Sequence, residues 1–288
     1  MTGIDEKRPS FGSKLHAGTA LVRLSTAGLA GLGGVAGLIV AAGRKVTTSI
    51  LLDVCLCFLV VFCSVGAGNT LNDYLDIEVD RINRPDRTLP RGALSPRVAL
   101  AIAISLFAIA IAGAIFLPRV ALAIVILAIA IQMCYEFAAK KLKSVGNVVI
   151  AGQTGLLFLF GGSIVGNLTP VLFFSTLSFL SILGREVAKD ISDVEGDVDR
   201  KTIPRTYGLP FARGISASMV LGAVLLSPIP FFLSGIVSIT YLEIVAVADA
   251  IFLYSVIVLF QGTPRRPESL MKYGMLIALI AFIVGRFI

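Results

Sequence analysis

The chain has 288 residues, of which 56% are hydrophobic and only 15% charged, whereas about a quarter of the residues in an ordinary soluble domain are charged. Its mean hydropathy is +0.91, and apolar runs of about 20 residues, each long enough to cross a bilayer as a helix, recur along the sequence. The chain is therefore predicted to be an all-α polytopic membrane protein, and its net charge of +7 must be interpreted by where the charges lie.

Apolar windows bounded by charged residues, proline or glycine predict nine membrane-spanning helices. Residues 1–18 carry three basic residues but no apolar segment of the signal-peptide type, so we expect a retained N-terminal tail. Residues 19–288 are predicted to form one domain. The spans are predicted at 19–42, 48–70, 97–117, 119–137, 147–166, 169–188, 212–233, 239–261 and 270–288.

The basic residues are distributed very unequally between the two sides of these spans. Twenty of the 25 Lys and Arg residues lie in the N-terminal tail or in segments on the same side, and four lie on the opposite side. Cytoplasmic loops are enriched in Lys and Arg, so the N-terminus and this charged face are predicted to be cytoplasmic. The remaining one, Arg23, falls inside the first span, where it is costly unless it is paired.

The acidic residues gather in two short stretches. Eleven of the 18 Asp and Glu residues lie between Asp73 and Asp86 or between Glu186 and Asp199. In the first stretch Asn72, Asp76 and Asp80 recur every four residues, and Asp73 lies three residues before Asp76. On a helix these side chains share one face.

The second stretch repeats this geometry on the same side of the membrane. Asp190, Asp193 and Asp197 recur at helical spacing, and Asp193-Val-Glu-Gly-Asp197 nearly copies Asp76-Ile-Glu-Val-Asp80. Four predicted spans separate the copies, as two parallel pseudo-repeats require, with their acidic motifs at 72–80 and 190–197. Each stretch alone is typical of a solvated helix end, but the pair favours a functional site.

Two negatively charged helix faces beside a membrane require a cation. The single histidine and the four cysteines, which have no C-x-x-C spacing, leave oxygen atoms as the expected ligands. Mg²⁺ accepts one or two protein carboxylates and leaves its other positions to water and phosphate oxygens. The predicted metal-binding residues are Asn72, Asp73, Asp76, Asp80, Asp190, Asp193 and Asp197.

Basic residues beside these acids are candidates to hold a diphosphate. Arginine and lysine donate charge-assisted hydrogen bonds to phosphate oxygens and stabilise a departing anion. Asp249, near the middle of the eighth span, needs a partner, and we expect a buried polar contact there. The predicted substrate-binding residues are Arg23, Arg84, Arg87, Arg91, Lys140, Lys143, Lys201 and Arg205.

With these spans and acidic motifs, the sequence resembles the UbiA-type intramembrane prenyltransferases. The resemblance rests on the nine spans, the N-D-x-x-D-x-x-x-D motif from Asn72 to Asp80 and the D-x-x-D-x-x-x-D motif from Asp190 to Asp197. The runs 80–87 and 185–197 are most similar to the archaeal digeranylgeranylglyceryl phosphate synthases. The chain departs from the family pattern at Thr26 and Arg91.

The resemblance implies nine helices around a central cavity open to the cytoplasmic side. It implies Mg²⁺-dependent transfer of a geranylgeranyl group from its diphosphate to the hydroxyl group of geranylgeranylglyceryl phosphate, a membrane-lipid precursor. Asp76, Asp80, Asp193 and Asp197 would then be the catalytic residues.

Two other functions stay open from the sequence. A related prenyltransferase with an aromatic, quinone-precursor acceptor would carry the same motifs. An ion or substrate transporter is favoured only by Asp249, since transport sites lie near the bilayer midplane. A nucleic-acid partner is not expected, because the basic residues alternate with acids beside the bilayer, which is typical of a face that binds lipid or phosphate.

Overall fold

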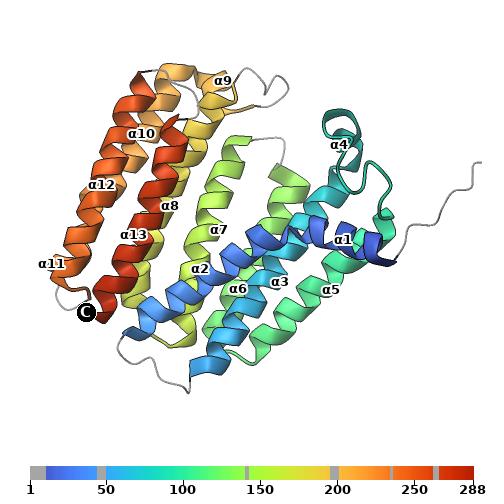
Figure 1. The fold of residues 1–288 in the computed structure, drawn as a ribbon, viewed down its shortest axis with the longest axis horizontal. Helices are drawn as coiled ribbons and strands as arrows, with labels where there is room; N and C mark the ends of the chain where they lie inside the picture. Colours follow the sequence, from blue (N-terminus) through green and yellow to red (C-terminus); the bar gives the residue numbers. More distant parts are fainter. Residues whose placement is uncertain (1–10, 44–49, 140–142, 195–200, 234–235, 262–265) are drawn as a thin grey trace, which may run out of the picture.

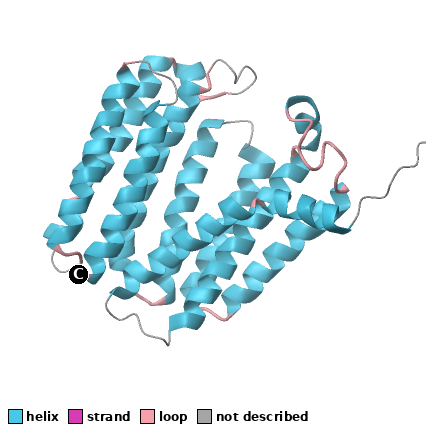
Figure 2. Ribbon diagram, in the orientation of Figure 1, coloured by secondary structure: helices cyan, strands magenta, loops and turns pink. Residues whose placement is uncertain are grey.

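The computed structural model describes residues 11–43, 50–139, 143–194, 201–233, 236–261 and 266–288. These residues form helices and connecting loops only (Figure 2). The elements are α1 (Phe11–Val22), α2 (Leu24–Ala42), α3 (Leu51–Leu75), α4 (Ile77–Asn83), α5 (Pro96–Ile115), α6 (Arg119–Cys134), the π-helical turn η3 (Tyr135–Ala139), α7 (Lys143–Ile164), α8 (Leu168–Ser192), α9 (Ile203–Tyr207), α10 (Leu209–Leu226), α11 (Ile229–Phe232), α12 (Ile239–Phe260) and α13 (Arg266–Phe287).

Within these residues, nine helices are long and apolar enough to cross a membrane, which confirms the predicted number of spans. Their outer surfaces carry many exposed large apolar side chains, such as Leu29, Phe116 and Leu225. An apolar surface of this extent is typical of helices that face lipid. The chain is therefore a multi-pass membrane protein.

The first span is shorter than predicted, because the helix breaks at Arg23. This residue has a left-handed backbone conformation, with φ 54° and ψ 63°, and α2 begins at the next residue. The preceding residues form α1, which buries Ala17 and Leu21 against Leu89 and Leu94. Part of the predicted N-terminal tail is thus a helix packed on the bundle.

The helices form two groups that α2 and α7 join (Figure 1). On one side α3 packs against α5, and on the other α8 packs against α10 while α12 packs against α13. Helix α2 crosses the bundle and contacts both α3 and α7, and α7 contacts α8. Two short helices lie at the same end of the bundle: α4, which contains the last residues of the first acidic motif, and α9, which follows the second motif (Figure 1).

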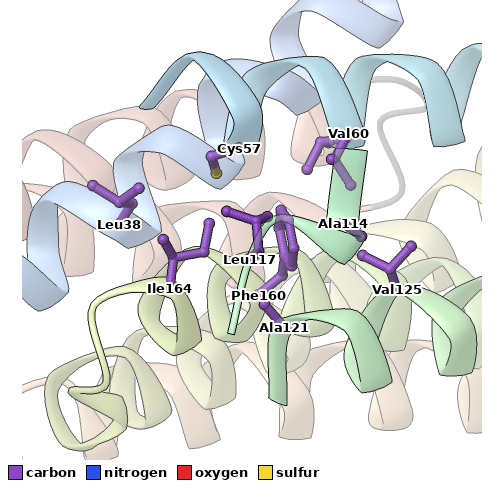
Figure 3. Close-up of a cluster of buried hydrophobic side chains, with 10 residues drawn as sticks. Leu38, Cys57, Val60, Ala114, Leu117, Ala121, Val125, Phe160 and Ile164 are labelled. Carbon is purple, nitrogen blue, oxygen red and sulfur yellow. The ribbon is translucent and has the colours of Figure 1, made fainter. Parts of the chain in front are cut away.

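An apolar cluster fixes α7 against the first group of helices (Figure 3). Its buried side chains come from α2, α3 and α7 and from the corner between α5 and α6. The cluster includes Leu38, Cys57, Leu117, Phe160 and Ile164. The cluster attaches the joining helices α2 and α7 to the first group.

Small residues allow the crossing of α2 and α7. A Cβ atom added to Gly161 would overlap the carbonyl oxygen of Gly34, and one added to Gly37 would lie 2.6 Å from the carbonyl oxygen of Phe158. These contacts are with backbone atoms, which cannot rotate away. Close approach of two helix backbones therefore depends on glycine here.

We expect Gly161→Ala to destabilise the bundle by at least about 2 kcal/mol, because α2 and α7 must move apart to admit the methyl group. Thermal unfolding of the detergent-solubilised protein measures this loss. The matched control is Gly152→Ala on the same helix, where an added Cβ meets nothing within 4 Å. Equal melting temperatures for the two variants would contradict the proposed close crossing.

Candidate active site

The two acidic motifs begin at equivalent points of two equally long helices. Helices α3 and α8 both have 25 residues, and each ends one residue before an aspartate of its motif. Asp76 has φ −91° and ψ 9°, and Asp193 has φ −95° and ψ 5°. Both helices extend four or five residues further than predicted, so the first part of each motif lies in the last turns of the span.

This location has an electrostatic consequence. The C-terminal end of a helix carries a partial negative charge, which disfavours a carboxylate there. Asp193 nevertheless occupies the C-cap of α8, and Asp76 is the C-cap of α3 as well as the N-cap of α4. Helices α4 and α9 lie on the same side of the bundle (Figure 1). Such an arrangement favours binding of a cation.

Two arginines hold the other aspartates of the first motif. Asp73 and Asp80 are 8% and 6% exposed. Arg87 contacts both of them, with its Nη1 atom 2.6 Å from Oδ2 of Asp80 and 3.4 Å from Oδ1 of Asp73. The Nη2 atom of Arg23 lies 2.6 Å from the same Asp73 oxygen. Arg23 thus has the acidic partner that its position in the sequence required.

The amide group of the first motif has a partner that the sequence analysis missed. The Nδ2 atom of Asn72 donates hydrogen bonds to both carboxylate oxygens of Glu136, at 3.1 and 3.2 Å. Glu136 lies in η3 and also accepts a hydrogen bond from Gln132 at 3.0 Å. The sequence shows Glu136 as an acidic residue at the end of the fourth span. The direction in which its side chain points depends on the packing of α6, which the sequence does not show.

The second motif is attached to α7. Asp190 is 1% exposed, and its Oδ2 atom accepts a hydrogen bond from Nδ2 of Asn147 at 2.7 Å. Asp193 is exposed at the end of α8, and the predicted ligand Asp197 lies outside the described residues. Asn147 was also missed, since a single asparagine at a helix start carries no distinctive pattern.

One turn before Asp190, Glu186 is buried and paired with basic residues of its own helix. Its carboxylate lies 2.8 Å from Arg185 and 3.5 Å from Lys189. Arg185 also contacts Glu268 of α13 at 2.9 Å. This network links α8 to α13. The charge of Glu186 is neutralised by Arg185 and Lys189, which are not residues of the acidic motif.

The predicted phosphate-binding residues differ in position. Arg23 and Arg87 lie among the acids, whereas Arg84 and Arg91 are exposed on the segment that follows the first motif. Lys201 and Arg205 are exposed before and in α9, at the same end of the bundle. Of the two predicted lysines of the fourth loop, Lys143 is the first residue of α7 and Lys140 lies outside the described residues.

In the part of the chain that the structure describes, no group of three or more His, Cys, Asp or Glu residues could by itself hold a metal ion. Asn72 and the aspartates of the two motifs nevertheless offer amide and carboxylate oxygens as ligands. These are hard ligands of the kind that Mg²⁺ prefers. Mg²⁺ requires only one or two protein carboxylates when phosphate oxygens complete its coordination. The residues present therefore fit an ion bound together with a diphosphate.

A separate cavity of about 110 Å³ lies among α7, α8, α10, α12 and α13. Phe158, Phe174 and Phe282 are among its mainly apolar lining residues, and Asp249 also borders it. The Ser227 hydroxyl group donates a hydrogen bond to Asp249 at 2.6 Å. Asp249 thus has the polar partner that was expected, in a partly buried contact.

In the described part of the chain, these features define an integral membrane protein with nine membrane-spanning helices and with paired acidic motifs and arginines at one end of the bundle. The chain belongs to the UbiA prenyltransferase family, whose model matches residues 30–280.

Relatives and solved structures agree with this membership. The chain is 37% identical to a digeranylgeranylglyceryl phosphate synthase of Methanocaldococcus jannaschii, over 96% of this chain and 98% of the relative. It is also 37% identical to the digeranylgeranylglyceryl phosphate synthase of Methanothermobacter thermautotrophicus, over 81% of this chain and 85% of the relative. A solved structure of a digeranylgeranylglyceryl phosphate synthase matches with 34% identity and a TM-score of 0.85, covering 95% of this chain and 98% of the other.

A more distant UbiA homologue from Archaeoglobus fulgidus, bound to GPP and Mg²⁺, has the same fold. It is 21% identical and matches with a TM-score of 0.73, over 94% of this chain and 98% of that one. This likeness confirms the predicted membrane fold.

Proposed function

We propose that this prenyltransferase moves a geranylgeranyl group from geranylgeranyl diphosphate to the hydroxyl group of geranylgeranylglyceryl phosphate. The observation that carries this assignment is the 37% identity to a digeranylgeranylglyceryl phosphate synthase over nearly the full length of both chains. The acidic motifs and the arginines beside them supply the groups that such a reaction needs. The product would be the diether core of a membrane lipid.

Mg²⁺ is the proposed cofactor, held by Asn72, Asp76 and Asp80 of one motif and by Asp190, Asp193 and Asp197 of the other. When bound, the ion would neutralise the negative charge of the leaving diphosphate. Asp73 belongs to the predicted set as well, but its carboxylate contacts two arginines. Both arginines contact the same oxygen atom, Oδ1.

Arg23 and Arg87 would bind the oxygen atoms of the diphosphate. Their guanidinium groups are oriented by Asp73 and Asp80, so they lose little freedom when an anion arrives. Charge-assisted hydrogen bonds from fixed donors stabilise the leaving group as its charge develops. No protein nucleophile is needed, because the acceptor hydroxyl group attacks the allylic carbon.

The cavity along α8 would receive part of a hydrocarbon chain. Ser181 borders it nine residues before Asp190, which is about 13 Å along a helix. A prenyl chain anchored by its diphosphate at the motif end would reach that depth. The apolar side chains of the cavity would shield that distal part of the prenyl chain from water.

The proposed orientation puts the motif end of the bundle in the cytoplasm. Its support is the excess of Lys and Arg on that side of the spans. The two pseudo-repeats are likewise a proposal, which the equal lengths of α3 and α8 and the matching conformations of Asp76 and Asp193 support. Parallel repeats would present both motifs to one substrate.

The decisive experiment incubates the purified protein with labelled geranylgeranyl diphosphate and competing acceptors. We expect a labelled diether phosphate product with geranylgeranylglyceryl phosphate, and loss of that product when EDTA replaces Mg²⁺. Preferential labelling of an aromatic quinone precursor would transfer the assignment to that acceptor class. Solute flux into proteoliposomes without consumption of the diphosphate would instead identify a transporter.

A further inference from the structure

Glu136 is a buried acid that belongs to neither acidic motif. It is 7% exposed and lies in η3, the single π-helical turn between α6 and the start of α7. Both of its carboxylate oxygens accept hydrogen bonds from the Asn72 amide. Isolated π-helical turns frequently occur at functional sites, because they redirect the side chains of a helix.

The chemistry of a carboxylate decides which end of the Asn72 amide it binds. An ionised carboxylate only accepts hydrogen bonds, so it can bind the NH₂ group and never the amide oxygen. The oxygen of Asn72 then remains available for another partner. A cation can use only that oxygen, because the NH₂ group carries a partial positive charge.

We propose that Glu136 is a positioning residue that holds the Asn72 amide with its oxygen directed to the metal ion of the first motif. This inference rests on the proposed function, since it assigns Asn72 as a ligand of Mg²⁺. Partners that orient a metal ligand commonly contribute a factor of about 10–100 to metal affinity. Glu136 would make such a contribution without touching the ion.

The position of Glu136 is itself fixed by a second contact one helical turn away. Gln132 donates a hydrogen bond to Glu136, and its side chain lies against Gly68, where an added Cβ would be 3.7 Å from it. Gly68 and Asn72 are four residues apart on α3, as Gln132 and Glu136 are on the facing segment. The two helices therefore meet in two successive contacts that restrict Glu136.

The first motif is consequently held from two directions. Asp73 contacts Arg23 and Arg87, whereas the adjacent Asn72 contacts the α6 side of the bundle. Rotation of the α3 end would break one set of contacts or the other. Glu136 thus fixes the orientation of the motif as well as that of the amide.

The test measures binding of Mn²⁺, a spectroscopic substitute for Mg²⁺, by electron paramagnetic resonance in the presence of inorganic diphosphate. Glu136→Met keeps the side-chain volume but removes the acceptor, and we expect about tenfold weaker Mn²⁺ binding. Glu136→Gln retains one acceptor oxygen and should recover most of the affinity. The control Glu78→Met makes the same change at an exposed acid paired with Arg81, and should bind Mn²⁺ within about twofold of the unaltered protein.

Action through Asn72 also predicts how substitutions combine. In an Asn72→Ala background, Glu136→Met should weaken Mn²⁺ binding no further, because the group that it positions is gone. If Glu136 acted only by its charge, Glu136→Gln would bind as weakly as Glu136→Met and the double variant would be weaker still. Either result would overturn the proposal.

The experiment separates this inference from the proposed function. The unaltered protein should bind Mn²⁺ and Asp76→Asn should not, and failure of that comparison would refute the metal assignment itself. Normal Mn²⁺ binding by Glu136→Met would refute only the role of Glu136. Should Glu136→Met not fold, Glu136→Ala provides the same comparison, with melting temperature as the check of folding.

Discussion

Asp76→Asn should leave a folded protein in the membrane and lower the rate of prenyl transfer by about a thousandfold. The substitution preserves the size of the side chain but removes the carboxylate charge at the proposed diphosphate–metal site, where charge stabilisation lowers the barrier. Asp193→Asn should behave alike, because Asp193 occupies the same place at the end of α8. The rate of product formation from labelled geranylgeranyl diphosphate measures the loss.

Stability distinguishes this loss from misfolding. A neutral amide is better tolerated than a carboxylate at a helix C-terminus, and asparagine serves as well as aspartate at the N-cap of α4, which Asp76 also occupies. The melting temperatures of both variants should therefore equal or exceed that of the unaltered protein. Glu78→Gln is the matched control, because its exposed carboxylate lies within the first motif but pairs with Arg81. Near-normal turnover by Asp76→Asn would refute the proposed site.

Arg87→Ala should lower prenyl transfer by about a hundredfold and also destabilise the protein. The substitution removes a proposed diphosphate ligand and leaves Asp80, which is nearly buried, without its arginine. We expect a stability loss of about 1–3 kcal/mol, less than for a fully buried pair because a quarter of the Arg87 side chain is exposed. Activity assays and thermal unfolding measure the two effects separately.

A second substitution tests the structural role of Arg87. Adding Asp80→Asn to Arg87→Ala removes the unpaired charge and should recover stability. Only the melting temperature of this double variant is informative, because Asp80 is itself a proposed catalytic residue. Arg81→Ala is the control, since Arg81 is an exposed arginine of α4 that pairs with the exposed Glu78. A double variant no more stable than Arg87→Ala would show that the unpaired charge of Asp80 does not cause the loss of stability.

The prediction of the spans succeeded because it required only local information. The bilayer core has no water to bind backbone N–H and C=O groups, so a spanning segment must form these hydrogen bonds within itself, as a helix does. A sufficiently long apolar run therefore specifies a span wherever it occurs. It was less accurate at Arg23, where a backbone break and the separate helix α1 replaced the predicted start of the first span. The extension of α3 and α8 into the acidic motifs was also not visible in hydropathy, because charged residues end an apolar window.

The sequence alone determined the class of membrane protein, the two acidic motifs and the family resemblance, since each depends on composition or on spacing along one helix. The tertiary structure decided which side chains meet: Arg23 with Asp73, Asn72 with Glu136, Asn147 with Asp190 and Ser227 with Asp249. These pairs are between 22 and 64 residues apart. Their contacts depend on how helices rotate and cross, which the packing of glycines and apolar side chains sets and which no local pattern contains.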